Sequence, residues 1–136
     1  MFKETYPVMR EDYVNAGKVS TDIKGLLKQL GLPADILRRI AVACYEAEIN
    51  MIIHSYGGEV VLEISEEGVY LSFNDCGPGI SDVEKAMMPG YSTASGKALE
   101  FGFGAGMGLP NIKRVADTFD LQTSSQGTCL RIGFRI

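Results

Sequence analysis

Cysteine is scarce in this sequence, and the few thiols present are far apart. Cys44, Cys76 and Cys129 are the only cysteines among 136 residues, and no two of them have the C-x-x-C spacing of a zinc site or a redox pair. An odd and dispersed set of this kind is typical of reduced thiols in an intracellular protein. The cysteine content therefore argues against a disulfide framework and against a structural zinc site.

An excess of positive charge and long apolar runs are also lacking. Lys and Arg total 13 against 17 acidic residues, a net charge of −4, which argues against the basic surface that nucleic-acid binding requires. Charged or amide side chains interrupt the apolar stretches, and none approaches the roughly 20 residues of a membrane span. Met1–Glu4 carries a charge pair with no apolar run behind it, unlike a signal peptide. We expect a cytoplasmic protein that binds no membrane and no nucleic acid, with nucleotides and proteins as its partners.

The composition is that of an ordinary globular domain. Apolar residues make up 46% of the chain and charged residues 22%, which argues against disorder. No internal repeat, linker or low-complexity segment interrupts the sequence. We therefore expect a single domain over residues 1–136.

The spacing of the apolar residues predicts mainly helices early in the chain and mainly strands later. Helical spacing runs from Asp12 to Leu30, with Gly31 as a stop signal. Pro7 limits the first expected strand to an edge position. The other helices are expected at about Pro33–Tyr56, near Ser81–Asp82 and at Gly108–Thr118, the strands at Thr5–Val8, Val60–Ser65, Val69–Asn74, Leu121–Ser124 and Thr128–Ile136, and a mobile loop at about Pro89–Gly106. This order predicts an α+β fold, a two-layer α/β sandwich with helices on one face of a mixed sheet.

Two polar residues of the second expected helix lie on its apolar side. Glu46 and Asn50 are four residues apart, which places them about 40° apart around a helix, on the arc that also carries Ile40 and Ile53. A buried carboxylate is costly unless it is paired or bound to a cation. Either both groups satisfy neighbouring backbone, or they place a carboxylate and an amide oxygen beside Mg²⁺ and a reacting hydroxyl.

Two other polar residues of this helix carry weaker signals. His54, the only histidine, continues the same ridge one turn beyond Asn50, where a structural role is more usual than a catalytic one. Glu48 lies well round the helix from Glu46, and we expect it to be solvated or paired with a basic residue.

A first glycine cluster, residues 75–80, follows the strand that ends near Asn74. Its sequence is Asp75-Cys76-Gly77-Pro78-Gly79-Ile80. Glycine allows a ligand to approach the backbone closely, and an aspartate at a strand end can accept a hydrogen bond from an exocyclic amine such as that of adenine. The alternative interpretation is a simple D-x-G turn.

A second cluster, Gly102–Leu109, alternates four glycines immediately before a helix. Free backbone N–H groups and the helix N-terminus can face an anion there, although a hinge is the alternative. The dinucleotide pattern G-x-G-x-x-G fails at Met107 and Leu109. Gly90–Ala98 is one residue too long for a P-loop and ends in alanine instead of the required hydroxyl.

Together, the motifs resemble the Bergerat ATP-binding fold shared by gyrase, the heat-shock chaperone ATPase, mismatch-repair ATPases and histidine kinases. Glu46-x-x-x-Asn50 is similar to its N box, Asp75-x-Gly77-x-Gly79 to its first glycine box and Gly104-x-Gly106-x-Gly108 to its second. The similarity extends from about Ala34 to Ile136. Within the superfamily, Tyr45–His54 and Gly106–Arg114 are most similar to the small bacterial anti-sigma factors and switch serine/threonine kinases.

The resemblance implies a division of roles in an ATP site. Asp75 would hold the adenine amine, with Gly79 and Thr128 lining the base pocket. Asn50 would ligate Mg²⁺, and Glu46 would orient and deprotonate a serine or threonine hydroxyl of a protein substrate. Lys97 would reach the phosphates from the expected lid or remain a solvated loop lysine. The residues expected to contact nucleotide are Asn50, Asp75, Gly77, Gly79, Ile80, Thr93, Lys97, Gly102, Gly104, Gly106, Met107, Gly108, Leu109 and Thr128.

The resemblance leaves four functions open. The leading hypothesis is a serine/threonine kinase that uses ATP and Mg²⁺ to phosphorylate a small anti-sigma-factor antagonist or a similar scaffold protein. The second is an anti-sigma factor whose ATP or ADP state controls binding to a sigma factor. A detached histidine-kinase catalytic domain ranks last, and plain ATP hydrolysis would use Glu46 on water. A homodimer is compatible with the resemblance, although no isolated apolar face demands one.

Overall fold

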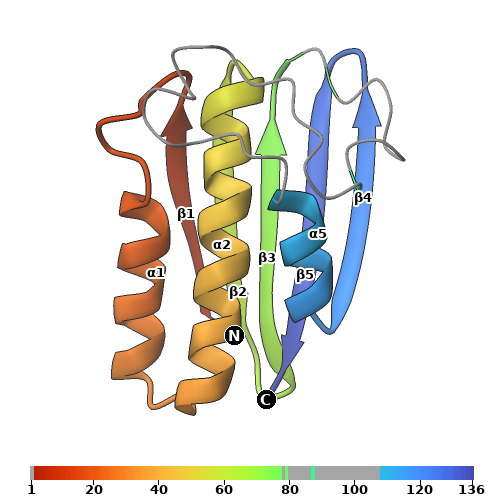
Figure 1. The fold of residues 1–136 in the computed structure, drawn as a ribbon. Coiled ribbons are helices and arrows are strands. Elements are labelled where there is room, and N and C mark those ends of the chain that lie inside the picture. The colour runs from red at the N-terminus through yellow and green to blue at the C-terminus, as the bar shows by residue number, and fades with distance from the viewer. Residues whose placement is uncertain (1, 78, 80–86, 88–107) are drawn as a thin grey trace.

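The computed structural model describes residues 2–77, 79, 87 and 108–136, which form an α+β fold as expected (Figure 1). The helix expected near residues 81–82 and the loop expected at 89–106 lie outside the described residues. In chain order the elements are β1 (Phe2–Met9), α1 (Lys18–Gln29), α2 (Ala34–His54), β2 (Gly57–Ile64), β3 (Gly68–Asp75), α5 (Gly108–Val115), β4 (Thr118–Ser124) and β5 (Gly127–Arg135).

The five described strands form one sheet in the order β1-β2-β3-β5-β4. All four of its pairings are antiparallel, so the expectation of a mixed sheet is wrong for these strands. Hairpins join β2 to β3 and β4 to β5, and a hairpin makes its two strands antiparallel. Between β1 and β2, the oppositely directed helices α1 and α2 return the chain to the end of the sheet where β1 finished (Figure 1). β2 therefore also runs antiparallel to its neighbour.

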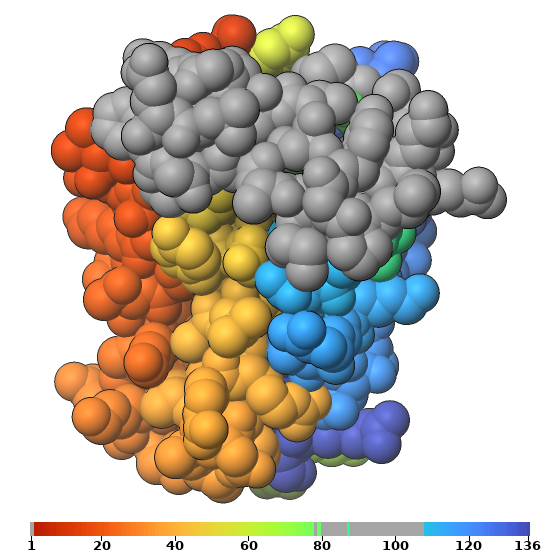
Figure 2. All heavy atoms as spheres, in the orientation of Figure 1, coloured from red at the N-terminus to blue at the C-terminus, as the bar shows by residue number. Residues whose placement is uncertain are grey.

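The described helices all lie on one face of the sheet (Figure 1), and Figure 2 views the molecule from that face, with the side chains of the helices in front. Side chains alternate between the two faces of a strand, so every second residue of the central strands faces the helices. Burying this apolar layer against the helices is the main stabilising contribution to the fold. The sheet contributes Val60, Leu62, Val69, Leu71, Phe73, Leu130, Ile132 and Phe134 to the core, and the helices contribute Ile23, Leu27, Ile40, Ala43, Ile52 and Ile112.

The first helix begins later than the apolar spacing indicates. We expected it from Asp12, but α1 starts at Lys18, because Gly17 has a left-handed φ of 91° that interrupts a helix. Before it, the Asp12 carboxylate accepts hydrogen bonds from Asn15 Nδ2 at 3.0 and 3.1 Å. Val14 is 86% exposed, so its place in the helical pattern does not reflect burial.

The other boundaries agree with the expected ones to within a few residues. β1 is an edge strand, as Pro7 predicts, and extends beyond Thr5–Val8 in both directions. α2 ends at His54, two residues before the expected Tyr56, and β2 begins at Gly57. The helix expected from Gly108 to Thr118 ends at Val115. Within the described residues, no helix combines the length and hydropathy needed to span a membrane.

Candidate functional site

The described residues of the sequence motifs lie on α2, at the end of β3 and at the start of α5, which are neighbours in the fold (Figure 1). Backbone hydrogen bonds join three chain segments there. Tyr56 N–H, just after α2, donates to the carbonyl of Cys76 at 2.7 Å, and Gly77 N–H donates to the carbonyl of Gln126 at 3.2 Å. Cys76 and Gly77 of the first glycine cluster are therefore fixed between the end of α2 and the β4–β5 turn.

Glu46 is a half-buried carboxyl on the side of α2 that faces α5. Burial raises its pKa above the ordinary value, and a side-chain hydrogen bond from Asn111 of α5 offsets part of that rise. In its ionised form such a carboxylate is a stronger base than a solvated one. The geometry is suited to accepting a proton.

Asn50, one helical turn further along α2, lies against the first residue of α5. A Cβ atom on Gly108 would lie 3.0 Å from Asn50 Nδ2 and 3.1 Å from Asn50 Oδ1. Even alanine at position 108 would therefore press against this amide. The close approach places an amide oxygen beside the N-terminus of a helix, where backbone N–H groups favour anions.

Asp75 ends β3 with its carboxyl half-buried and directed toward β5. Its Oδ1 accepts a hydrogen bond from the backbone N–H of Thr128 at 3.0 Å. Burial raises the pKa of Asp75, and the Thr128 N–H lowers it in part. One carboxylate oxygen is thus held by backbone, and a carboxylate has a second oxygen that can accept a hydrogen bond.

Gly79 lies against the β4–β5 hairpin beside Asp75. Its φ is 73°, and a Cβ there would overlap the carbonyl of Ser124 and lie 2.7 Å from Thr123 Oγ1. The hydroxyls of Thr123 and Thr128 share a hydrogen bond of 2.9 Å between their oxygens. Only glycine fits at this position, and the two threonines border the same space as Asp75.

The other residues predicted for the site fall into two groups. Gly77 is buried beside Ser55, and Leu109 is 8% exposed with its side chain in the hydrophobic core. Ile80, Thr93, Lys97, Gly102, Gly104, Gly106 and Met107 lie outside the described residues.

Sequence reasoning missed two residues around the site, Asn111 and Thr123, and was wrong about Glu48 on the opposite side of α2. Asn111 lies three residues after Gly108 on the same helix face, a spacing that could have indicated it. Thr123 pairs directly with Thr128 in the β4–β5 register, but nothing in the sequence fixes that register. Glu48, expected to be solvated or paired with a basic residue, is only 2% exposed and accepts backbone hydrogen bonds.

A family model described as the histidine kinase-like ATPase domain matches residues 9–134. The chain belongs to the histidine kinase-like ATPase family. The matched range contains every residue of the candidate site, and membership of this ATPase family implies that the chain binds ATP. The five-stranded sheet with helices on one face is consistent with the Bergerat fold expected from the motifs.

Two kinds of relative are similar to this histidine kinase-like ATPase. The serine/threonine-protein kinase RsbT of Bacillus subtilis is 31% identical over 110 residues, which cover 77% of each chain. Anti-sigma F factors are similarly related. That of Bacillus velezensis is 32% identical over 117 residues, which cover 81% of this chain and 77% of the relative, and that of Bacillus subtilis is 31% identical with the same coverage.

Proposed function

We propose that this chain is an ATP-dependent serine/threonine protein kinase that phosphorylates a small anti-sigma-factor antagonist or a similar scaffold protein. The observation that carries the proposal is Glu46, a half-buried carboxyl with a raised pKa next to the start of α5. Neither ion pair formed among the described residues involves it. Glu46 is therefore available to take the proton of an acceptor hydroxyl.

The donor set fits a magnesium ion that takes most of its ligands from phosphates and water. Asn50 offers one hard amide oxygen beside the α5 N-terminus, and Mg²⁺ commonly uses only one or two protein groups in phosphate sites. When bound, the ion would supply charge neutralisation to the phosphates. The chain's own residues would orient the reactants.

The proposed transfer is a single displacement at the γ-phosphorus of ATP. The acceptor hydroxyl oxygen forms a bond to that phosphorus while the bond to the β,γ-bridging oxygen breaks, and ADP leaves with the electron pair. The hydroxyl proton passes to Glu46. Asp75 and the Thr123–Thr128 pair would hold the base, while Glu46 and Asn50 would serve the phosphates and the acceptor from α2.

The relatives support two versions of the proposal. One is named a serine/threonine-protein kinase and the others anti-sigma F factors. The second candidate function is therefore an anti-sigma factor that binds a sigma factor under ATP or ADP control, with little or no phosphotransfer. The two versions use the same nucleotide site and differ only in whether Glu46 acts on an acceptor.

Substitution of Glu46 tests the kinase proposal. With labelled ATP and candidate partner proteins encoded nearby, wild-type protein should place acid-stable phosphate on serine or threonine. Glu46→Gln should retain ATP binding and lose phosphotransfer by roughly 100-fold or more, the usual contribution of a general base. Transfer by the wild type should fall as pH drops through the raised pKa of Glu46, because the base is then protonated.

The exposed Glu66→Gln in the β2–β3 turn is the matched control and should leave transfer unchanged. Undiminished transfer by Glu46→Gln would exclude Glu46 as the base. Stable complexes with a sigma factor and no transfer by the wild type would favour the anti-sigma version. Acid-labile phosphohistidine on the partner would contradict both.

A further inference from the structure

Glu48 is a buried carboxylate for which the proposed reaction has no direct use. It lies on α2 between Glu46 and Asn50 and is 2% exposed. Burying a charge costs free energy unless hydrogen bonds or an opposite charge compensate it. For Glu48 this compensation comes from hydrogen bonds with the backbone of a different helix, α1.

The Glu48 carboxylate caps the N-terminus of α1. Its Oε2 accepts from Gly17 N–H at 3.1 Å and from Val19 N–H at 3.4 Å, and its Oε1 accepts from Ser20 N–H at 3.0 Å. The first N–H groups of a helix have no partner within the helix. Gly17, the N-cap residue, has no side chain to supply one, and the first turn of α1 contains no acid. Glu48 therefore replaces the missing cap from outside the helix.

Glu48 projects from the opposite side of α2 to Glu46 and Asn50. Successive residues are about 100° apart, so Glu48 is about 160° from both Glu46 and Asn50 around the axis. Glu48 is held by the start of α1, while Glu46 and Asn50 face the start of α5. A rotation of α2 would break the buried hydrogen bonds on one side and misalign the polar pair on the other.

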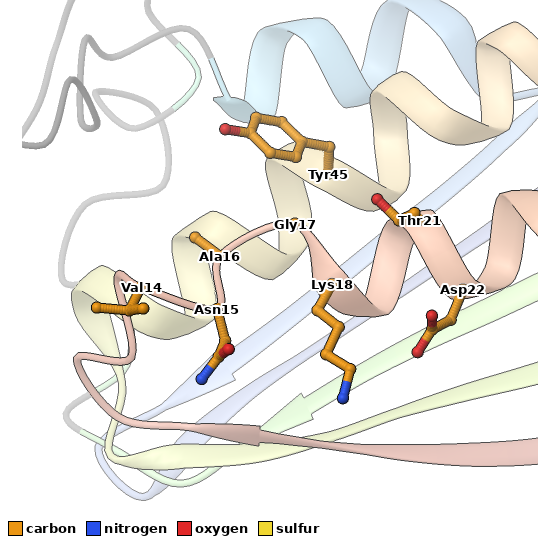
Figure 3. A pocket seen from close by; sticks show the side chains of 8 residues that line it. All are labelled: Val14, Asn15, Ala16, Gly17, Lys18, Thr21, Asp22 and Tyr45. Carbon is orange, nitrogen blue, oxygen red and sulfur yellow. The ribbon is translucent and has the colours of Figure 1, made fainter.

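Gly17, at the start of α1, also packs against the side chain of Tyr45 on α2. Tyr45 projects from α2 over Gly17, and an added Cβ on that glycine would lie 3.1 Å from Tyr45 Cε1 (Figure 3). The segment before α1, the first turn of α1 and Tyr45 line an open depression at this place. The contact between Gly17 and Tyr45 is a second interaction, besides the Glu48 hydrogen bonds, between the start of α1 and the turn of α2 that carries Glu46.

We propose that Glu48 is a positioning residue, which fixes the rotation of α2 so that Glu46 and Asn50 face α5. Its effect on turnover rests on the proposed kinase function, whereas its effect on the geometry of α2 does not. Glu48 touches neither nucleotide nor acceptor and acts only through the helix it shares with Glu46.

Glu48→Gln tests this role with little change in side-chain size. The amide group that replaces one oxygen cannot accept from the α1 N–H groups, so part of the cap is lost. We expect kcat for phosphotransfer to fall roughly ten- to hundredfold, as for a small misplacement of a catalytic group. The Kd for ATP should change less than kcat does, because Asp75 and Thr128 lie on the sheet and keep their positions, while Asn50 is the only proposed nucleotide contact on α2. The backbone amide NMR signals of Glu46 and Asn111 should also shift.

Ser20→Ala is the matched control. It removes the bond of 3.0 Å from Ser20 Oγ to the Gly17 carbonyl and so weakens the same helix start, while it keeps all three bonds to Glu48. All variants are assayed well below their unfolding temperatures. Ser20→Ala should keep the wild-type kcat and the wild-type signals of Glu46 and Asn111.

Two results separate this inference from the kinase proposal. If Glu48→Gln lowers Tm but keeps the wild-type kcat and leaves the Glu46 and Asn111 signals unchanged, Glu48 only stabilises α1 and the inference is wrong. If the wild type transfers no phosphate to any partner, the kinase proposal fails, and the positioning role of Glu48 is then judged from the NMR spectra of Glu48→Gln alone. Displaced Glu46 and Asn111 signals then support the positioning role, and unchanged signals contradict it.

Discussion

Asp75 and Glu46 have pKa values raised by the same cause but are held by different kinds of donor. Asp75 accepts from the backbone N–H of Thr128, whereas Glu46 accepts from the side-chain amide of Asn111. A backbone donor in a sheet is fixed, while a side-chain amide can rotate away. Asp75 is therefore suited to permanent recognition of a ligand. Glu46 can exchange its partner, as the proposed general base would have to do in each turnover.

Asp75→Asn should weaken nucleotide binding without destabilising the protein. The amide oxygen can keep the Thr128 hydrogen bond, and removal of a half-buried carboxylate relieves a desolvation cost. We expect the affinity for ATP to fall roughly tenfold or more, in line with the loss of a charged hydrogen bond. The rise in Tm that ATP produces should shrink accordingly.

Thermal unfolding with and without ATP or GTP measures both effects. Asp120→Asn, an exposed residue of β4, is the control and should behave as the wild type. An Asp75→Asn variant that keeps the wild-type preference for ATP over GTP would remove the adenine assignment from Asp75.

Single residues also show where sequence reasoning is strong and where it fails. Glu46 and Asn50 could be placed together because a helix fixes the angle between them. Glu48 could not be assigned correctly, because the helical wheel gives directions around α2 but not the identity of the element on each side. The partner of Glu48 is the backbone of α1, and backbone groups leave no signature in a sequence.

At the scale of elements, Arg39 joins α2 to the end of α5 and to Asp117, which precedes β4. Its Nε donates to the Val115 carbonyl at the end of α5, and its Nη2 pairs with Asp117 Oδ1, both at 2.9 Å. Asp117 Oδ2 in turn accepts from Arg135 N–H of β5 at 2.7 Å. The guanidinium carbon of Arg39 also lies 5.7 Å from the centre of the Phe134 ring. This cluster fixes the end of α5 that is remote from the nucleotide site.

The Asp117 contacts predict a dependence of stability on acid. The Arg135 N–H is the main cause that holds the pKa of Asp117 below its ordinary value, and Arg39 adds to it. A lowered folded pKa means that the stabilisation is complete above the unfolded value and is lost as pH falls through the folded value. Asp117→Asn should lower Tm by roughly 2–4 °C at neutral pH, as for an exposed pair with one added hydrogen bond.

Melting curves at a series of pH values check this prediction. The difference in Tm between the wild type and Asp117→Asn should disappear as the solution becomes strongly acidic. A difference that persists after Asp117 is protonated would show that packing, and not charge, causes the effect.

The elements were mostly predictable because their apolar residues recur at helical or strand spacing. The main error at this scale was the start of α1, where Val14 follows the helical pattern but is exposed. Gly17 is a better indicator of where α1 begins, because its left-handed φ separates the irregular segment after β1 from the helix.

At the scale of the whole molecule, the layers were predictable but the strand directions were not. Whether two strands run parallel depends on how many elements lie between them and on which face those elements pack. The α1–α2 pair makes β1 antiparallel to β2, and the segment that contains α5 lets β5 insert between β3 and β4. Local periodicity does not contain this information.

The antiparallel order also brings both ends of the described chain to the β2–β3 turn. Phe2 pairs with Ile64, and Ile136 N–H donates to the Glu67 carbonyl at 3.2 Å. This turn lies at the opposite end of the sheet from the nucleotide site (Figure 1). Three strand spacings separate β1 from β5, about 14 Å, which a linker of roughly six residues spans.

A circular permutant that joins these ends and opens the chain between Gly31 and Leu32 should therefore fold and bind ATP within about threefold of the wild-type affinity. Isothermal titration with ATP checks this, and a permutant opened within β3 is the disruptive control. A folded permutant without ATP affinity would show that the α1–α2 connection transmits strain to the site. Success of the permutant would mean that the order in which the chain visits its strands can be changed while the contacts of α2 with α1 and α5 are kept.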